Sequence, residues 1–337
     1  MFDETTYQLA AQKALGNWTL SIDKLDLSSR SENVVYKVST PGPQSYALRI
    51  HRPGYNSIEE LKSEVKWAST LRDCGVYVPK HIKTKDGEHY ASIEIGPTKQ
   101  EHYVGLIEWL DGVSLESLIK TSEKPQIENY YFKLGELMAE VHNQSASWKQ
   151  PRQFTRRKWD ADGLMGLTPL WGKFWTTKEL NAEQKELMET ARSRLHHELS
   201  RLEQTPESYG VIHADLHAAN VLVQGEKLQI IDFDDCGYSW HSYEIAVAET
   251  DAQSKIKKER ISAAEIRSAM VNGYTSLRPL TTSIENQLSV LTMVRKLIQL
   301  GWANDRRDLI PDDFFGPYIK QLCPVVESYL SNSKVIS

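Results

Sequence analysis

The stretch VIHADLHAANVLVQGEKLQIIDFDD, Val211 to Asp235, restricts the fold of this chain more than any other segment. Two short apolar runs, NVLV and KLQII, lie on either side of the turn residues QGE. Such a pattern predicts a tight β-hairpin that turns at Gly225. Long helical patterns precede and follow it, so the fold must hold a pair of strands within a mainly helical region.

The predicted hairpin brings three oxygen-bearing side chains together. With the turn at Gly225, Asn220 and Asp232 face each other, or are one step apart, at the open end, where facing Cβ atoms lie about 5 Å apart. Asp215 precedes Asn220 by five residues of loop, which places it next to the same space. We therefore expect Asp215, Asn220 and Asp232 to form one site.

The N-terminal part of the chain predicts an antiparallel sheet interrupted by one helix. Short runs rich in β-branched and aromatic residues predict strands at 18–27, 33–40, 45–50, 89–95 and 102–110. Between the third and fourth runs the apolar spacing becomes helical. Ser57 is the expected N-cap of this helix, Glu60 completes a capping box, and Gly75 ends it.

Most of the remaining chain predicts helices. Helical spacing recurs over residues 126–145, 178–203, 257–277, 283–303 and 312–331. Between Trp148 and Thr177 four tryptophans occur without a clear period. A segment of that length without regular pattern is typical of a functional or mobile region.

The change of pattern near residue 110 predicts where the chain divides. A chain of 337 residues is long for a single compact core and suits two lobes. We expect an α+β, two-lobed fold, with a small antiparallel-sheet lobe at 1–107, a hinge at 108–112 and a larger, mainly helical lobe at 113–337.

Composition narrows the range of partners. The formal net charge of −5 argues against nucleic acid and favours a neutral or cationic small molecule. Cys74, Cys236 and Cys323 are scattered without a CxxC pair, which favours a reducing compartment. No apolar run reaches the roughly 18 residues of a membrane span, and the N-terminus does not read as a signal peptide. We expect a cytoplasmic protein with no membrane partner.

The oxygen donors around the hairpin indicate a particular chemistry. Aspartate and asparagine oxygens without thiol ligands suit Mg²⁺, which keeps several waters and is completed by substrate phosphates. Phosphoryl transfer requires charge neutralisation and one carboxylate that orients the attacking hydroxyl and accepts its proton. We assign Asp215 as that base, and Asn220 and Asp232 as metal ligands.

The motif HADLHAAN followed by IDFDD resembles the catalytic loop and metal-binding segment of the aminoglycoside phosphotransferase and choline kinase superfamily, which has a protein-kinase-like fold. The usual pattern is HGDLHxxN followed by IDxxD. Ala214 stands here in place of the glycine, and Glu244 where an aspartate is common. Segments around residues 46–72 and 154–175 look more like the homoserine-kinase-like and bacterial stress-response-kinase branch.

The resemblance implies that ATP is the phosphoryl donor and that Arg49 contacts its phosphates. Arg49, in ALRI, occupies the strand position where protein kinases keep the phosphate-pairing lysine. Glu64 on the following helix is its implied ion-pair partner, and Glu60 is the competing residue. Arginine is permanently charged and binds carboxylate or phosphate oxygens through two nitrogens, so charge neutralisation survives the replacement.

Two further segments have implied nucleotide contacts. The turn SSRSEN lies where a glycine-rich loop would cover the phosphates, and its backbone N–H groups with the hydroxyls of Ser29 and Ser31 would serve instead. The segment EWLDG resembles the hinge, where the backbone of Glu108, Trp109 and Leu110 would meet adenine.

Several of these side chains also have structural interpretations. Single aspartates and asparagines commonly cap loops, although the joint pattern favours function. His213 and His217 are expected to brace the catalytic loop through backbone hydrogen bonds. Asp235 resembles the second aspartate of the family motif, whereas Asp234 could simply be solvated.

The tryptophans of the helical lobe have two interpretations. They are usually core residues, an interpretation that covers Trp159, Trp171, Trp175 and Trp240. Alternatively some of them, such as Trp175 and Trp240, line a pocket with Asp160 or Asp162, in which rings and carboxylates attract an amine.

Three functions remain open on the sequence. The first is an ATP- and Mg²⁺-dependent kinase that phosphorylates a hydroxyl of a small metabolite such as an amino alcohol, a hydroxy amino acid or a sugar. The second applies the same chemistry to a serine or threonine of a protein. The third is a metallohydrolase that uses His213, Asp215 and His217 as ligands, which leaves Asn220 and Arg49 without a role.

Overall fold

The computed structural model describes residues 3–257, 259–279 and 282–332, and the side chains of 282–286 lie outside the description. Contacts divide the chain into two compact units. The first unit comprises Met1–Val113, Gln150–Arg156 and Leu222–Asp234, and the second comprises Ser114–Lys149, Arg157–Val221 and Asp235–Ser337. The sequence assigned all residues after 112 to one lobe, whereas the contacts group two later segments with the N-terminal sheet.

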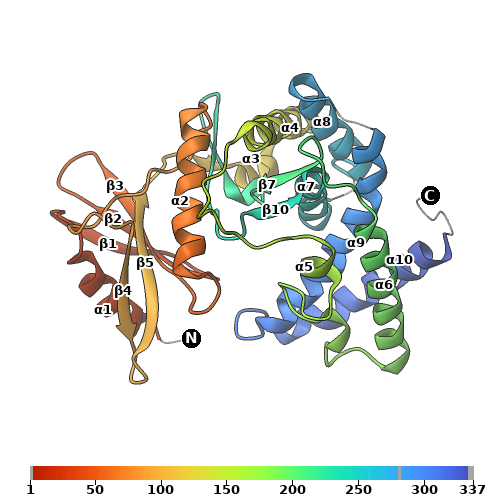
Figure 1. Ribbon diagram of the computed structural model, residues 1–337, viewed down its shortest axis with the longest axis horizontal. Helices are drawn as coiled ribbons and strands as arrows, with labels where there is room; N and C mark the ends of the chain where they lie inside the picture. The colour runs from red at the N-terminus through yellow and green to blue at the C-terminus, as the bar shows by residue number, and fades with distance from the viewer. Residues whose placement is uncertain (1–2, 258, 280–281, 333–337) are drawn as a thin grey trace. The chain divides into compact units, whose positions relative to one another are not determined.

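The first unit contains the predicted antiparallel sheet (Figure 1). Its strands, in the spatial order β1-β2-β3-β5-β4, are β1 Lys24–Arg30, β2 Val34–Ser39, β3 Ser45–Ile50, β5 Gln100–Glu108 and β4 Tyr90–Ile95. The first strand begins later than expected, because residues 18–23 have no regular structure. Helix α1, Glu4–Leu15, precedes them and was not predicted. The buried side of α1 is largely alanine, so its apolar stripe is weak in the sequence.

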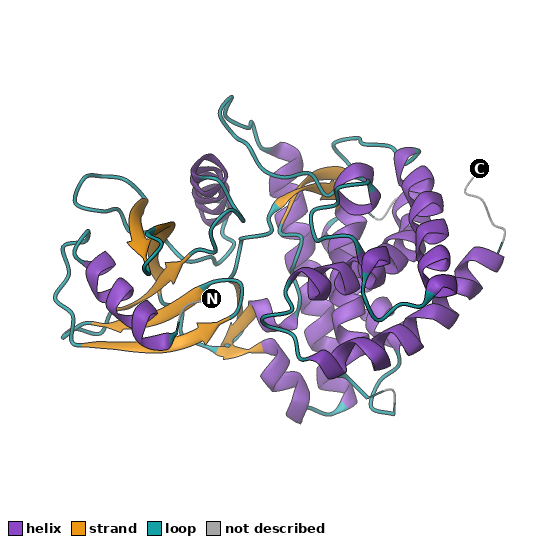
Figure 2. Cartoon of the chain, turned by 90° about the horizontal axis from the view of Figure 1, so that it is seen from below, coloured by secondary structure: helices purple, strands orange, loops and turns teal. Residues whose placement is uncertain are grey.

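The two faces of this sheet have different neighbours (Figure 2). Side chains alternate between faces along a strand. Leu48 and Ile50 of β3 belong to the core cluster that includes α1, and Arg49 between them points to the opposite side, which helix α2, Ile58–Asp73, covers. The predicted capping box of Ser57 and Glu60 is present in α2.

The predicted hairpin is confirmed. Strands β8, Val221–Gln224, and β9, Lys227–Ile230, are hydrogen-bonded neighbours on either side of Gly225, whose φ of 62° is the left-handed conformation that glycine adopts easily. The side-chain amide of Gln229 donates to the Asp111 carbonyl at 2.7 Å. A third short strand, β6 Val113–Ser114, completes the sheet in the order β6-β8-β9.

The second unit is mainly helical, as predicted (Figure 2). The long helices correspond to the predicted ones and are α4 Lys124–Ser147, α6 Ala182–Ser200, α8 Ala263–Leu277, α9 Thr282–Asp305 and α10 Phe315–Ser331. Residue 258, within the predicted helix 257–277, lies outside the described residues. Shorter elements are α3 Leu115–Thr121, α5 Ala161–Met165 and the 3₁₀ turns Phe174–Thr176, Ala218–Asn220 and Asp312–Phe314.

Helix α7, His241–Lys255, was not predicted. Every residue from His241 to Thr250 is buried, so the helix has no polar face to mark its period. It follows a two-stranded antiparallel sheet of β7, Tyr209–Ile212, and β10, Gly237–Trp240.

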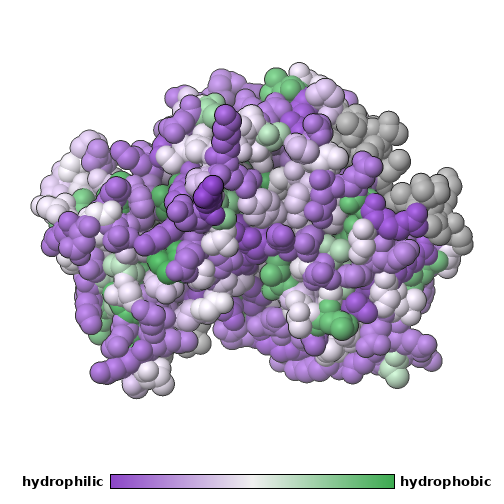
Figure 3. Space-filling view, in the orientation of Figure 1, coloured by the Kyte–Doolittle hydropathy of each residue, from purple (hydrophilic) through white to green (hydrophobic). Residues whose placement is uncertain are grey.

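The surface shown in Figure 3 is mostly hydrophilic, with hydrophobic side chains in separate spots. Among the described helices, none has the length and apolar composition required to cross a membrane.

Candidate active site

The loop from His213 to Asn220 in the second unit is held by Glu244 at the start of α7. One carboxylate oxygen of Glu244 accepts from the His213 backbone N–H at 2.8 Å, and the other from the Leu216 N–H at 3.3 Å. Burial raises the pKa of this carboxyl group. The longer side chain, found where the family often has aspartate, therefore still anchors the loop.

Ala214 adopts a φ of 66°, the left-handed region that favours glycine. A residue with a β-carbon loses about 1–2 kcal/mol there. This conformation gives a physical reason for the glycine in the usual family motif.

Asp215 is held at both carboxylate oxygens. Its Oδ1 lies 2.6 Å from Nη2 of Arg295, and its Oδ2 lies 3.3 Å from Nε2 of His217. Burial alone would raise the pKa of Asp215, but the charges of His217 and Arg295 outweigh it and hold the pKa well below its usual value. Asp215 is therefore a carboxylate at neutral pH, with 21% of its side chain exposed.

Asn220 contacts Asp215 through its amide nitrogen. Nδ2 donates to the Asp215 carbonyl at 2.9 Å and to Oδ2 at 3.2 Å. With the nitrogen turned toward Asp215, the amide oxygen is the atom that can face a cation.

Both loop histidines accept hydrogen bonds from backbone N–H groups of the loop, as expected of bracing residues. Nδ1 of His213 accepts from the Asp215 backbone N–H at 3.3 Å, and His213 is fully buried. Nδ1 of His217 accepts from the Ala219 N–H at 3.3 Å. Two carboxylates lie near the His217 ring. Oδ2 of Asp215 is 3.3 Å from Nε2, and Oδ2 of Asp251 is 3.8 Å from Nδ1.

Arg295 is a site residue that the sequence analysis missed. It comes from α9, is 4% exposed, and its guanidinium carbon lies 4.6 Å from the centre of the Trp171 ring. The sequence did carry a signal, since Arg295 interrupts the apolar run LTMVRKLIQL. A charged residue among buried apolar positions is almost always paired.

In the first unit, Arg49 contacts three carboxylates. Its Nη2 lies 2.6 Å from Oδ1 of Asp232 and 3.2 Å from Oδ2 of Asp234, and its Nη1 lies 4.0 Å from Oε1 of Glu64. Glu60, the competing candidate, uses its carboxylate to cap α2 at the Ser57 N–H. The structure thus brings Glu64 near Arg49, but two aspartates lie closer.

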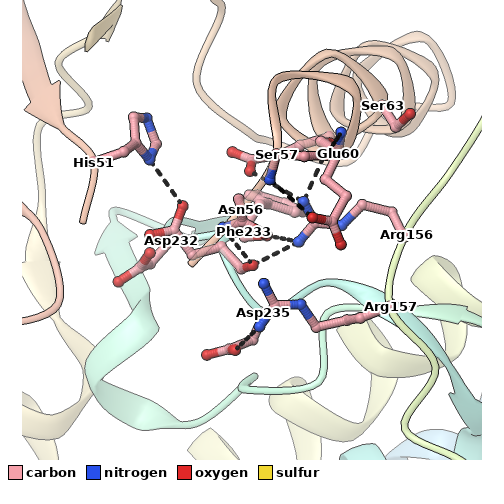
Figure 4. Close-up of polar contacts among 12 residues, drawn as sticks. His51, Asn56, Ser57, Glu60, Ser63, Arg156, Arg157, Asp232, Phe233 and Asp235 are labelled. Carbon is pink, nitrogen blue, oxygen red and sulfur yellow. Dashed lines mark hydrogen bonds and ion pairs between the residues drawn. The ribbon is translucent and has the colours of Figure 1, made fainter. Parts of the chain in front are cut away.

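Asp234 is buried, which contradicts the interpretation that it is solvated. The backbone carbonyl of Asp234 accepts from Arg156 at 2.5 Å. Arg156, which the sequence analysis did not single out, also donates to the carbonyls of Phe233 at 3.4 Å and Glu60 at 3.2 Å (Figure 4). Asp235, which resembles the second aspartate of the family motif, belongs to the second unit. Its Oδ1 lies 3.5 Å from Nη1 of Arg157.

Asp232 differs from its neighbours in exposure. Half of its side chain (49%) is exposed, and its φ of 67° is left-handed, as aspartate tolerates better than most residues. An exposed carboxylate and an amide oxygen are the donor types that Mg²⁺ prefers. The facing of Asn220 and Asp232 stays a prediction, because the two residues belong to different units.

The two segments with predicted nucleotide contacts lie at connections of the sheet. Ser29 is exposed on β1 after a bulge, and Ser31 is exposed in the turn, where its N–H donates to the Asn33 carbonyl at 3.0 Å. At the end of β5, the N–H of Glu108 donates to the Lys80 carbonyl and that of Trp109 to the Ser45 carbonyl. Leu110 is half-buried.

The predicted amine pocket is corrected by burial. Trp240 is fully buried and its indole donates to the Glu203 carbonyl at 3.1 Å. Trp175 is 7% exposed within the same core cluster, where Arg192 covers its ring. Asp160 caps α5 by accepting from the Gly163 N–H at 3.0 Å. Burial therefore contradicts the pocket interpretation for the two tryptophans, and Asp160 has a capping contact.

The hydrolase alternative required His213, Asp215 and His217 to bind one metal ion. Within the described residues, no group of three or more His, Cys, Asp or Glu side chains could hold a metal. The His213 ring is instead part of the loop's internal hydrogen bonding.

Comparisons with known proteins identify a family and a shared fold. The model of the phosphotransferase enzyme family matches residues 25–280. Amicoumacin kinase of Bacillus subtilis (strain 168) is 26% identical over 236 residues, or 70% of this chain, and the match spans just under two thirds of that kinase, 65%. Homoserine kinase of Methylobacillus glycogenes is 28% identical over 265 residues, 77% of this chain and 72% of the relative.

A solved structure extends the likeness to nearly the whole chain. The microcompartment-associated aminopropanol kinase is 30% identical, superposes with a TM-score of 0.81, and the alignment covers 96% of this chain and 98% of that one.

Proposed function

The chain belongs to the phosphotransferase enzyme family, and from that membership we propose that it is an ATP- and Mg²⁺-dependent kinase that phosphorylates a hydroxyl group of a small metabolite. The predicted family resemblance and the predicted α+β, protein-kinase-like fold are confirmed by the same comparisons. The donor, the metal, the acceptor and the site residues are parts of the proposal. A cytoplasmic location, where thiols stay reduced, completes it.

The observation that carries the proposal is the state of Asp215. This carboxylate is ionised, partly exposed, and fixed by contacts to both oxygens. A group held in that way can accept a hydrogen bond from an alcohol with little loss of entropy. A carboxylate fixed in this way is what phosphoryl transfer to a hydroxyl needs from a protein.

The proposed reaction is an in-line displacement. Asp215 orients the acceptor hydroxyl, whose oxygen forms a bond to the γ-phosphorus while the bond from that phosphorus to the β,γ-bridging oxygen breaks. The hydroxyl proton passes to Asp215, and ADP leaves. Because the base is weak, we expect proton transfer to follow most of the bond breaking to ADP, as in a loose transition state.

The remaining roles follow the motif. Asn220 and Asp232 are the proposed magnesium ligands, and the bound ion would neutralise charge on the phosphates. Arg49 is the proposed phosphate contact, supported by the 2.6 Å distance from its Nη2 to Oδ1 of Asp232, a proposed metal ligand. Ser29 and Ser31 are proposed to cover the phosphates, and the backbone of residues 108–110 to meet adenine.

An amino alcohol or a hydroxy amino acid is the favoured acceptor, ahead of a sugar. Aminopropanol is an amino alcohol and homoserine a hydroxy amino acid, and kinases named for both are among the similar proteins. The net charge of −5 also suits an acceptor that carries an ammonium group.

The test is an ADP-release assay over a panel of amino alcohols, hydroxy amino acids and sugars, with wild-type protein, Asp215→Asn and the control Asp312→Asn. Asp312 is an exposed aspartate of the same unit, with 86% of its side chain accessible. We expect at least one acceptor to give turnover that Asp215→Asn lowers about 1000-fold or more and Asp312→Asn leaves unchanged. Turnover with no panel member, together with phosphoserine or phosphothreonine detected by mass spectrometry, would replace the proposal with the protein-kinase alternative.

A further inference from the structure

Asp234 has several partners in the described part of the first unit. Its side chain is 7% exposed and lies against Arg49, against His51 at 3.5 Å, and against the amide of Asn33, which donates to Oδ2. Its backbone carbonyl accepts from Arg156 at 2.5 Å and from Asn56 at 3.3 Å. Side-chain and backbone contacts together hold Asp234 in place.

The distances rank the partners of Arg49. Asp234 is 0.8 Å closer to the guanidinium than Glu64 is, at 3.2 Å compared with 4.0 Å. A charge-assisted hydrogen bond needs a separation near 2.7–2.9 Å and weakens quickly beyond it. Glu64 is therefore the weakest of the three partners.

Glu64 lies near two arginines and close to neither. Its Oε2 is 3.9 Å from Nη1 of Arg156, and its Oε1 is 4.0 Å from Nη1 of Arg49. Asp234, in contrast, lies 3.2 Å from Nη2 of Arg49.

The two aspartates beside Arg49 differ in what they can reach. Asp232 is half exposed and Asp234 is buried. Of the two carboxylates, Asp232 is therefore the one that a ligand from solvent can meet, whereas Asp234 contacts Arg49 and Asn33.

Asn33 connects Asp234 to the turn that replaces a glycine-rich loop. Asn33 is 5% exposed and follows Ser31 and Glu32 in that turn. Its amide nitrogen donates to Asp234, and its amide oxygen accepts from the Arg52 backbone N–H at 3.3 Å. A turn without glycine thus obtains a fixed position from a side-chain contact.

We propose that Asp234, rather than the helix residue Glu64, positions Arg49 for the nucleotide phosphates and, through Asn33, holds the glycine-free turn in place. Asp234 is a positioning residue, because its carboxylate does not touch the reacting groups. The inference rests on the proposed function, since it takes Arg49 to be the phosphate contact.

Arginine in place of lysine fits this arrangement. A guanidinium donates through several nitrogens in one plane and can contact Asp232 and Asp234 together, while a lysine ammonium is a single point charge. The arginine and the buried aspartate would then form one functional pair.

The test is a double-mutant cycle of Arg49→Lys and Asp234→Asn, read out as the dissociation constant of Mg²⁺–AMP-PNP by calorimetry and as KM for ATP. Asp234→Asn is expected to weaken nucleotide binding roughly tenfold or more, and Glu64→Gln less than about threefold. The double variant should bind about as weakly as the worse single variant, because the lost interaction is shared. KM for the acceptor should stay within about twofold, which a general structural defect would not allow.

Asp26→Asn is the matched control. Asp26 makes an exposed pair with Lys24 on β1, so the same substitution there should leave nucleotide binding unchanged. Thermal unfolding of each variant identifies loss of folding. Asn33→Ala removes the contacts of Asn33 with Asp234 and with the Arg52 N–H, and is expected to raise KM for ATP about three- to tenfold while the Arg49 pair persists.

The outcomes separate the two proposals. Wild-type protein that binds no Mg²⁺–AMP-PNP would overturn the proposed function. Wild-type binding combined with equal effects of Glu64→Gln and Asp234→Asn, or with independent effects of Arg49→Lys and Asp234→Asn, would overturn the role of Asp234 and leave the kinase assignment intact.

Discussion

Arg295 and Asp215 come from parts of the second unit that are 80 residues apart in sequence. The guanidinium makes Asp215 a weaker base, and it also fixes the direction of Oδ1. In a loose transition state the hydroxyl proton moves late, so orientation of the base matters more than its strength. In the proposed reaction, Arg295 would therefore act by holding the carboxylate of Asp215 in place.

We expect Arg295→Met to lower kcat about 10- to 100-fold, and Arg295→Lys to recover part of that loss, because lysine keeps the charge but not the planar contact with Trp171. Steady-state kinetics with the identified acceptor measures both. Arg307→Met is the control, since Arg307 pairs with Glu179 at 2.7 Å in a partly exposed position. Equal losses for Arg295→Met and Arg307→Met would contradict the role of Arg295.

At the scale of elements, helices α4 and α8 pack at two glycines. A β-carbon on Gly273 of α8 would lie 1.9 Å from the Phe132 carbonyl oxygen, and one on Gly135 of α4 would lie 2.0 Å from that of Met270. We predict that Gly273→Ala lowers the free energy of unfolding by about 3 kcal/mol, because the helices must move apart. Urea denaturation measures the change.

Gly316 of α10 provides the contrast for this prediction. A β-carbon there has no atom within 4 Å, and alanine favours helix by up to about 1 kcal/mol over glycine. Gly316→Ala should therefore leave stability unchanged or raise it slightly. Similar destabilisation by both substitutions would show that the close approach of α4 and α8 is not the cause.

Two buried histidines connect α4 and α7. His142 and His241 stack with ring centres 4.4 Å apart, and burial lowers the pKa of each well below 6.5. Below that ordinary value the unfolded chain binds protons that the folded chain does not, so stability is complete above about pH 6.5 and falls as the pH decreases. The free energy of unfolding therefore changes with pH, and two such groups add up to about 2.7 kcal/mol per pH unit to the slope of that change.

We expect His241→Asn to reduce this slope by about half, because one of the two proton-linked groups is gone. Urea denaturation at pH 7.5, 6.5 and 5.5, for wild-type and variant, gives the slopes. His196→Asn is the control, since His196 is partly exposed in a pair with Asp162. A His241→Asn slope equal to that of the wild-type protein would argue against the buried pair as its source.

At the scale of the whole molecule, nucleotide binding should stabilise the native chain. A ligand that binds only the folded state adds about 2.7 kcal/mol at 100 times its dissociation constant. We expect AMP-PNP to raise the melting temperature only when Mg²⁺ is present, an effect that Asp232→Asn abolishes and Asp215→Asn preserves. Loss of the shift in Asp215→Asn would mean that Asp215 contacts the nucleotide rather than the acceptor.

Elements with a strong local signal could be read from the sequence. The hairpin around Gly225, the capping box of α2 and the long helices of the second unit all depend on residues within a few positions of one another. Helix α1 escaped prediction because its buried side is small alanines, and α7 because it is buried all round. In both cases the period that marks a helix is missing from the sequence, although the helix is present.

The sequence by itself determined the residue types of the proposed site and their order, because the catalytic motif is a local pattern of a loop and a hairpin. Only the tertiary structure decided which distant groups complete it: Arg295 beside Asp215, and Asp234 instead of Glu64 as the nearer partner of Arg49. It also placed Trp175 and Trp240 in the core. The physical reason is that ion pairs and burial depend on contacts between segments 80 to 183 residues apart, which no local period encodes.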